Sequence, residues 1–209
     1  ELDLKRHILS MLTNNSDCEK NLNFLGAGCW QHHVPAICDE ITSRAEFLTN
    51  VWGTPSSDHG RNQSLFEFCS LLGDLLKTDM VGLPVYSYGC AVGHAIRMAS
   101  RITGRNKIII PKIIDPERKG VIKNYCEPEY MEDHIEIIEC DFDEKTGCID
   151  IEHLNQILTN DVAGVYFEVP NYFGVIEKNG EIISSLCAKN GSETIVGCDP
   201  ISLGILKSP

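Results

Sequence analysis

The sequence predicts an α/β protein, in which a mainly parallel sheet lies between two layers of helices. In its second half, short apolar segments alternate with amphipathic ones, as in consecutive β-strand and α-helix units. Several apolar segments end at polar or turn-forming residues, as strands of a parallel sheet do. The chain has 209 residues, of which 43% are hydrophobic, so it can form one domain with a substantial core.

The first half of the chain predicts helices separated by polar loops. Leu2–Leu12 has the spacing of an amphipathic helix, Pro35 suits the start of a second helix that runs to about Leu48, and Ser64–Lys77 forms a third. Residues Val51–Asn62 are rich in turn formers and predict a loop. The apolar faces of the three helices are Leu4, Ile8, Leu9 and Leu12; Ile37, Ile41, Ala45 and Leu48; and Leu65, Phe68, Leu72, Leu75 and Leu76.

The second half predicts strands that alternate with helices. The expected strands are Val81–Val85, Lys107–Pro111, His134–Cys140, Val162–Val169 and Glu193–Cys198. The expected helices are Cys90–Arg101, Pro116–Tyr125, a helix capped by Asp150 that runs to Leu158, and Gly180–Lys189. In the first of these helices, one apolar face is formed by Ala91, Ala95, Met98 and Ile102. We therefore divide the chain into an N-terminal helix and arm, residues 1–34, and a large α/β domain, residues 35–209.

The charge and the cysteine content of the chain indicate which partners and which cellular compartment to expect. The formal net charge is −12 and no dense cluster of lysine and arginine occurs, so the sequence argues against binding to nucleic acid or to an anionic membrane. No apolar segment reaches the length of a membrane span, and no signal-peptide pattern opens the chain. Ten cysteines without a Cys-x-x-Cys pair, several of them in predicted strands or helices, favour free thiols in a reducing cytoplasm.

Polar residues at predicted strand ends mark a candidate binding crevice. Ser87, Asn171 and Asp199 each follow a predicted strand, and ligands of parallel sheets collect at the carboxyl ends of strands. The turn Tyr86–Gly89 opens a helix, whose first N–H groups and dipole suit a phosphate. The alternative is that these strands simply run into polar loops. For Asp199, we expect a carboxylate that faces the crevice; the alternative is a cap on the short turn Ile201–Leu203.

Six longer motifs carry a resemblance to a known family. They are Phe24–Ala36, Ser43–Thr49, Ser57–Arg61, Arg97–Arg105, Pro170–Glu177 and Asp199–Gly204. In this order, over nearly the whole chain, they resemble subunit 1 of the glycine cleavage system P-protein, the decarboxylating glycine dehydrogenase. Family members are about twice as long, so the resemblance implies a large domain of pyridoxal-phosphate fold type I that is incomplete at its C-terminus.

The resemblance also implies an activity and partners. The family enzyme decarboxylates glycine and passes the aminomethyl group to the lipoyl arm of the H-protein. In its two-subunit form, subunits 1 and 2 pair as a heterotetramer, and the Schiff-base lysine resides on subunit 2. This chain ends at Pro209, and Lys207 is too near Asp199 to serve, so we expect the partner rather than this chain to hold pyridoxal phosphate. The positions that correspond to cofactor-binding residues are Ser87, Gly89, Cys90, Asn171 and Asp199.

Other interpretations stay open at this point. Related sequences often carry an acidic residue at the position of Ser87 and a small or amide residue at that of Cys90, which favours a non-catalytic interaction or scaffold domain with a decayed crevice. A zinc ion could be held by Cys29, His32 and His33 with Asp58 and His59. The preferred interpretation is that these polar residues pack a loop near a subunit interface. Arg61 could pair with an anion there. Cys90 and His94, one helical turn apart, could form a nucleophilic pair. The apolar stripes of the first two helices predict self-association.

Overall fold

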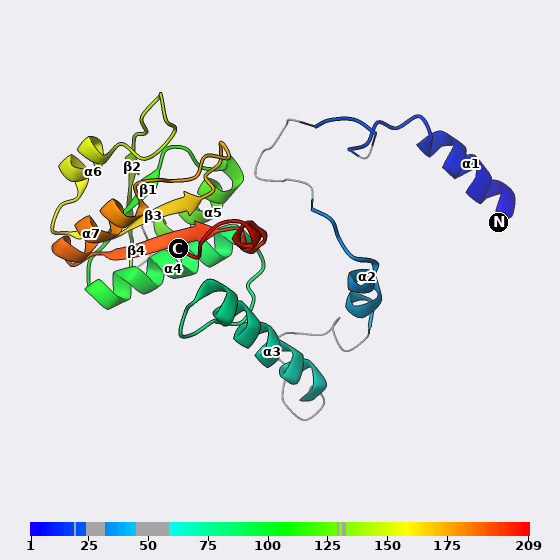
Figure 1. Ribbon diagram of the computed structural model, residues 1–209, viewed down its shortest axis with the longest axis horizontal. Coiled ribbons are helices and arrows are strands. Elements are labelled where there is room, and N and C mark those ends of the chain that lie inside the picture. The colour runs from blue at the N-terminus through cyan, green and yellow to red at the C-terminus, as the bar shows by residue number, and fades with distance from the viewer. Residues whose placement is uncertain (19, 24–31, 45–58, 129, 131–132) are drawn as a thin grey trace. The chain divides into compact units, whose positions relative to one another are not determined.

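The computed structural model describes residues 1–18, 20–23, 32–44, 59–128, 130 and 133–209 (Figure 1). The chain divides into two compact units, Glu1–His32 and His33–Pro209. The first unit contains α1 (Leu2–Leu12), which has the predicted bounds. No residue of α1 is buried, so its apolar face, which includes Leu4, Ile8 and Leu9, is exposed.

Helices α2 (Ala36–Thr42) and α3 (His59–Leu76) differ from the predicted bounds. The predicted extension of α2 to Leu48 is wrong, because α2 ends at Thr42. The hydroxyls of Thr42 and Ser43 donate to the Cys38 and Glu40 carbonyls, and such bonds compete with a regular helix. Ile37 is 57% exposed and Ile41 is 40% exposed, although we expected both to be buried. Ala45 and Leu48 lie outside the described residues.

The start of α3 corrects the predicted loop. His59 to Asn62 are helical, although we placed them in the loop Val51–Asn62, and residues 51–58 lie outside the description. Adding a turn to an existing helix costs little compared with nucleation, so polar residues can extend a helix that the following apolar residues stabilise. Of the predicted apolar face of α3, Leu65, Leu72 and Leu76 are half-buried, whereas Phe68 and Leu75 are exposed.

The second unit is built on a four-stranded, wholly parallel sheet. Its strands are β1 (Lys107–Pro111), β2 (Glu136–Cys140), β3 (Val162–Val169) and β4 (Glu193–Cys198), in the order β2-β1-β3-β4. Ile109 in β1 pairs with Ile138 in β2 and with Val165 in β3. The predicted α/β class with a parallel sheet is confirmed, and three of these strands have the predicted bounds.

Two strand predictions need correction. Val81–Val85 forms no strand, because Gly82 and Pro84 weaken and interrupt a strand ladder, and proline has no N–H to donate. His134 and Ile135 precede β2 rather than belong to it.

Helices cover both faces of the sheet (Figure 1). One face packs against α4 (Tyr88–Thr103) and α5 (Pro116–Cys126), around a core that contains Ile96, Ile108 and Tyr166. The other face packs against α6 (Ile151–Ile157) and α7 (Gly180–Asn190), around Leu154 and Phe167. The short 3-10 helix η3 (Pro200–Gly204) follows β4. The predicted three-layer arrangement is thus present.

The buried face of α4 is not the predicted one. Met98 and Ile102 are 56% and 62% exposed, while Val92, Ile96 and Ala99 are buried. Gly89 and Gly93 share the buried face and allow α5 to approach closely: a Cβ atom at Gly93 would lie 2.6 Å from the Tyr125 ring. Apolar spacing gives no weight to glycine, although Gly89 and Gly93 are the residues that let this face pack closely on α5.

No helix in the described ranges is long and apolar enough to span a membrane. The nine cysteines within these ranges are free thiols.

Candidate functional site

The carboxyl ends of the four parallel strands lie at one edge of the sheet, which we call the carboxyl edge. The residues that follow the strands there are Lys112, Asp141, Pro170 and Asp199. The first turn of α4 reaches the same edge at β4. A Cβ atom at Gly197 would lie only 2.5 Å from Tyr88 Oη and 2.7 Å from Tyr166 Oη, so glycine is required where the two hydroxyls meet β4.

The N-terminus of α4 is capped but retains two amide donors. Ser87 Oγ accepts the Cys90 N–H at 3.1 Å, and the Ser87 carbonyl accepts the Ala91 N–H. The N–H groups of Tyr88 and Gly89 have no acceptor among the described residues. Two free amides at the positive end of a 16-residue helix suit an anion such as a phosphate. Gly89 is also a packing residue, because a Cβ atom there would lie 2.9 Å from Val121.

Cys90 lies in the first turn of α4 and forms a polar group with α5. Hydrogen bonds from the Ser87 side chain and then from the Tyr125 hydroxyl lower the pKa of the Cys90 thiol. His94 Nε2 lies 3.5 Å from Tyr125 Oη, and the two rings meet edge to face. Tyr125 therefore contacts both members of the proposed Cys90–His94 pair. The arrangement favours a thiolate.

A buried ion pair that sequence reasoning missed supports the first turn of α4. Arg118 Nη1 in α5 donates to Glu168 Oε1 in β3 at 2.5 Å, and both side chains are more than nine-tenths buried. Tyr166 Oη donates to the same oxygen at 2.6 Å. The Arg118 guanidinium also stacks on the Tyr88 ring, with its carbon 3.9 Å from the ring centroid. The pair thus fixes the residue that follows the Ser87 cap.

The pKa values in this cluster favour a charged ion pair and neutral phenols. Burial, with the nearby Glu168 carboxylate, raises the pKa of Tyr88 and of Tyr166 well above the usual range. Burial is the largest single effect on the Arg118 pKa and lowers it, but the hydrogen bond to Glu168 and the charge of Glu168, with smaller effects of Tyr166 and Tyr88, together leave the pKa raised. The sequence did hold a signal: Glu168 shares a strand face with Tyr166 in an otherwise apolar strand, and a buried carboxylate requires a partner.

Asn171 serves the loop that follows β3. Its Oδ1 accepts the N–H groups of Phe173 and Val175 at 3.0 and 3.1 Å, and its Nδ2 donates to the Gly147 carbonyl at 2.8 Å. The Val169–Pro170 peptide bond that precedes it is cis. The Asn171 amide therefore joins the loop after β3 to the connector between β2 and α6.

Asp199 caps the turn that follows β4. Its Oδ1 accepts the Ile201 N–H at 3.1 Å, and Ser202 Oγ donates to its backbone carbonyl at 2.6 Å. Asp199 therefore acts as a cap, which was the alternative interpretation. It also lies on the carboxyl edge, two residues beyond Gly197, where β4 meets Tyr88. Both Asp199 and the first turn of α4 therefore adjoin the end of β4, whereas Asn171 is tied to Gly147.

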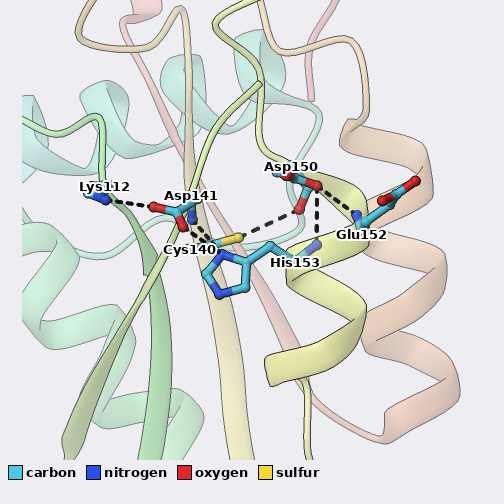
Figure 2. Close-up of polar contacts among 6 residues, drawn as sticks. All are labelled: Lys112, Cys140, Asp141, Asp150, Glu152 and His153. Carbon is cyan, nitrogen blue, oxygen red and sulfur yellow. Dashed lines mark hydrogen bonds and ion pairs between the residues drawn. The ribbon is translucent and has the colours of Figure 1, made fainter. Parts of the chain in front are cut away.

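Lys112, Asp141 and His153 form a second polar group on the carboxyl edge (Figure 2). Asp141 Oδ1 lies 2.7 Å from Lys112 Nζ, and its Oδ2 lies 3.4 Å from His153 Nδ1. The Asp141 N–H donates to the same ring nitrogen at 3.0 Å. The hydrogen bond between Lys112 and Asp141 raises the pKa of the lysine and lowers that of the aspartate, so this amine is held in its protonated form.

The start of α6 completes the group in Figure 2. Asp150 caps the helix as predicted, accepting the N–H groups of Glu152 and His153 at 2.9 and 3.1 Å. Cys140 Sγ lies 3.8 Å from the Asp150 carbonyl, and burial raises the pKa of this thiol to about 12. Cys140 is therefore a protonated packing residue rather than a nucleophile at neutral pH.

The candidate zinc residues contribute little to the described site. Cys29 and Asp58 lie outside the described residues, as do the side chains of His59 and Arg61, while His32 and His33 are exposed. Within the described ranges, no group of three histidine, cysteine or acidic side chains could hold a metal ion.

Comparison with protein families and sequences places the chain among known proteins. The family model "Glycine cleavage system P-protein" matches residues 2–209. A "Probable glycine dehydrogenase (decarboxylating) subunit 1" of Thermococcus kodakarensis is 36% identical over 210 residues, which cover all of this chain and 45% of that protein. The corresponding protein of Carboxydothermus hydrogenoformans is 35% identical over all of this chain and 46% of its own length. The chain thus spans less than half the length of these relatives.

Solved structures agree on the fold. A crystal structure of "glycine decarboxylase (P-protein) of the glycine cleavage system, in inhibitor-bound form" superposes with a TM-score of 0.81 at 23% identity, covering all of this chain and 45% of that one. An aminotransferase from Neisseria meningitidis superposes with a TM-score of 0.54 at 14% identity over 79% of this chain and 42% of its own. The fold is therefore that of the pyridoxal-phosphate fold-type-I proteins.

Proposed function

The chain belongs to the glycine cleavage system P-protein family, and from this premise we propose that it acts as subunit 1 of a two-subunit glycine decarboxylase. In this role it works with a subunit 2 to decarboxylate glycine and to deliver the aminomethyl group to the lipoyl H-protein. The observation that carries the proposal is the match of residues 2–209 to the family, with relatives that are named as subunit 1 over all of this chain.

The carboxyl edge has residues that fit part of a pyridoxal-phosphate site. The two free amides of Tyr88 and Gly89 supply donors for a phosphate, at the positive end of the α4 dipole. Asp199, at the end of β4, supplies a carboxylate that could face a protonated pyridine nitrogen. When bound, pyridoxal phosphate supplies an electron sink for the carbanion that decarboxylation leaves. The residues of this chain would hold and orient the cofactor rather than react with it.

The reactive lysine, in this proposal, comes from the partner subunit. Lys112 follows β1 on the carboxyl edge, but its amine lies 2.7 Å from Asp141 Oδ1 and is engaged in that ion pair. This supports a division of labour in which the partner holds the cofactor covalently and this chain completes the cleft.

Reconstitution with the subunit 2 of the same organism tests the activity. We expect release of labelled carbon dioxide from carboxyl-labelled glycine when both subunits, pyridoxal phosphate and a lipoylated H-protein are present, and none when either subunit is left out. A chain that decarboxylates glycine without subunit 2, or a subunit 2 that is equally active without this chain, would contradict the proposal.

Chemical trapping tests the position of the lysine. After the chain is mixed with pyridoxal phosphate and reduced with borohydride, mass spectrometry should find no lysine that is labelled stoichiometrically. Subunit 2 treated in the same way should carry one such label. A single fully labelled lysine in this chain, with none in subunit 2, would overturn the division of labour.

The second candidate function is a non-catalytic scaffold for subunit 2. The observation that favours it is that polar atoms of Asn171 and Asp199 already bond to backbone groups of this chain. The variants S87A and D199N separate the two functions in the reconstituted complex. Catalytic participation predicts a loss of decarboxylation at unchanged assembly, whereas a scaffold predicts unchanged turnover.

A further inference from the structure

A basic cavity lies at the opposite edge of the sheet, where β1 and β2 begin. Its volume is about 310 Å³, within the range of pockets that bind small molecules. Asn106 precedes β1, His134 precedes β2, and Gly104 ends α4, so the cavity is formed where three elements meet. None of the residues proposed to bind the cofactor lines it. Its polar and charged lining residues are Arg97, Ser100, Arg101, Arg105, Asn106, Asp133 and His134.

The cavity carries positive charge in a chain whose formal net charge is −12. Three arginines line it, against one carboxylate among the described lining residues, Asp133, which pairs with Arg97 at 3.1 Å. Among the described residues, Arg105 donates to uncharged acceptors, the Val162 and Asn190 carbonyls and Ser192 Oγ, none of which lines the cavity. Arg101 is exposed and has no ion-pair partner among the described residues. Within the part of the chain that the structure describes, Arg101 and Arg105 therefore have no carboxylate as ion-pair partner.

Arg97 and Arg105 are already held in place by hydrogen bonds, as residues of a preformed binding site are. Arg97 Nη1 donates to the Tyr125 carbonyl at 3.0 Å, and Arg105 is held by bonds at 2.9 and 3.0 Å to the carbonyls of Val162 and Asn190. His134 Nδ1 is buried and has no hydrogen-bond partner among the described residues, and a buried polar atom normally finds one.

The dipole of α4 accounts for only part of this charge. The C-terminus of a helix is negative and favours one cation nearby, which Arg101 in the last turn provides. It does not require a second and a third guanidinium from Arg97 and Arg105 beside the same cavity. Arginine, with its planar set of N–H donors, is suited to carboxylate and phosphate groups.

We propose that this cavity is a binding site for a small soluble dianion, such as inorganic phosphate or a dicarboxylate, with Arg101 as the exposed arm and Arg97, Arg105 and His134 as the preformed wall. The site is separate from the carboxyl edge and does not depend on the proposed glycine decarboxylase activity. Its occupancy would let the level of an anionic metabolite act on the same unit that carries the candidate cofactor site.

Titration of the full chain with inorganic phosphate, followed by amide resonances at constant ionic strength, tests the proposal. We expect saturable shifts at Gly104, Arg105 and Asn106. The exposed variant R101Q should bind at least about tenfold more weakly, as expected for the loss of one charge-assisted contact. The control R6Q removes another exposed arginine, in α1, and should bind as the wild type does.

The location of the shifts distinguishes this site from the candidate cofactor site. Phosphate at the N-terminus of α4 would shift the Tyr88 and Gly89 amides and would be unaffected by R101Q. The proposal is overturned if residues 104–106 show no saturable shift, or if R101Q and R6Q bind phosphate equally well.

Discussion

At the scale of single residues, the most consequential feature is the ion pair of Arg118 and Glu168. Both side chains are almost fully buried, and Tyr166 and Tyr88 surround them. Burying such a pair gains little over an apolar pair of the same size, but removing one partner leaves an unpaired charge in the core. The pair therefore fixes how α4, α5 and β3 meet at the carboxyl edge.

Replacing Glu168 should destabilise the domain strongly. E168Q leaves the Arg118 guanidinium buried without a counter-charge, so we expect the free energy of unfolding to fall by about 3–5 kcal/mol. Urea unfolding measures the change. The double variant R118M/E168L is the control and should recover most of the loss, because it removes both charges. A single variant that loses less than about 1 kcal/mol would show that the charge is not confined as described.

The Cys90 thiol should react at lower pH than an ordinary thiol. Its pKa is lowered by Ser87 and Tyr125, so at any pH below the usual thiol pKa a larger fraction is thiolate, the reactive form. Alkylation by iodoacetamide, followed at the Cys90 peptide by mass spectrometry over a pH series, should therefore have its midpoint below that of an ordinary exposed thiol. The variant Y125F keeps the ring but removes the hydroxyl, so its midpoint should rise. Equal midpoints for the two proteins would contradict the role of Tyr125.

At the scale of elements, the strands that were predicted correctly are those whose bounds depend on local sequence pattern. Strands β1, β3 and β4 have their predicted bounds, because runs such as Ile108–Ile110 are apolar on both faces, as buried parallel strands are. The buried face of α4 depended on its close packing against α5, which no local pattern encodes. Val81–Val85 has enough apolar residues for a strand, but Pro84 and Gly82 prevent it.

Some residues of the candidate site could likewise be located from local sequence pattern, and others could not. The cap at Ser87 and the strand end at Asp199 could be located from sequence, because turns and caps have local signatures. The partnership of Arg118 with Glu168 could not, since the two residues lie 50 positions apart and meet only when α5 packs on the sheet.

Two helical glycines should respond in opposite ways to alanine. In G93A, the new Cβ atom would lie 2.6 Å from the Tyr125 ring, so α5 must move, and we expect a loss of about 1–3 kcal/mol of stability. In G120A, the Cβ atom meets nothing within 4 Å, so the better helix propensity should add up to about 1 kcal/mol. Thermal and urea unfolding of both variants measure the difference. Similar effects in the two would show that α4 and α5 are not closely packed.

At the scale of the whole molecule, the exposed apolar surface of the N-terminal unit stands out. The large apolar residues of α1 are all 47–63% exposed; they are Leu2, Leu4, Ile8, Leu9, Met11 and Leu12. A continuous apolar face of this kind marks an interaction surface in soluble proteins. In the proposed complex, a partner subunit would cover it.

Without a partner, the chain should self-associate through α1. Light scattering over a wide concentration range should show a mean mass that increases with concentration. The variant I8S/L9S removes two apolar residues from the face and should shift this increase to higher concentration, whereas K5S on the same helix should not. A wild-type chain that stays monomeric throughout the range would contradict this expectation.

The strand order also bears on how the chain assembles as it is made. β1 lies inside the sheet, β2 adds to one side of it, β3 to the other, and β4 to the free side of β3. Each strand that leaves the ribosome after β1 therefore meets an edge that is already present, so no earlier pairing has to open. Parallel pairings are slow to form because they close long loops. Because the sheet grows outward from β1, these loops can close in the order in which the strands are synthesised, at about 5–20 residues per second. β4 is the last strand to appear, and with β2 it forms the two outer strands of the sheet in the described part of the chain.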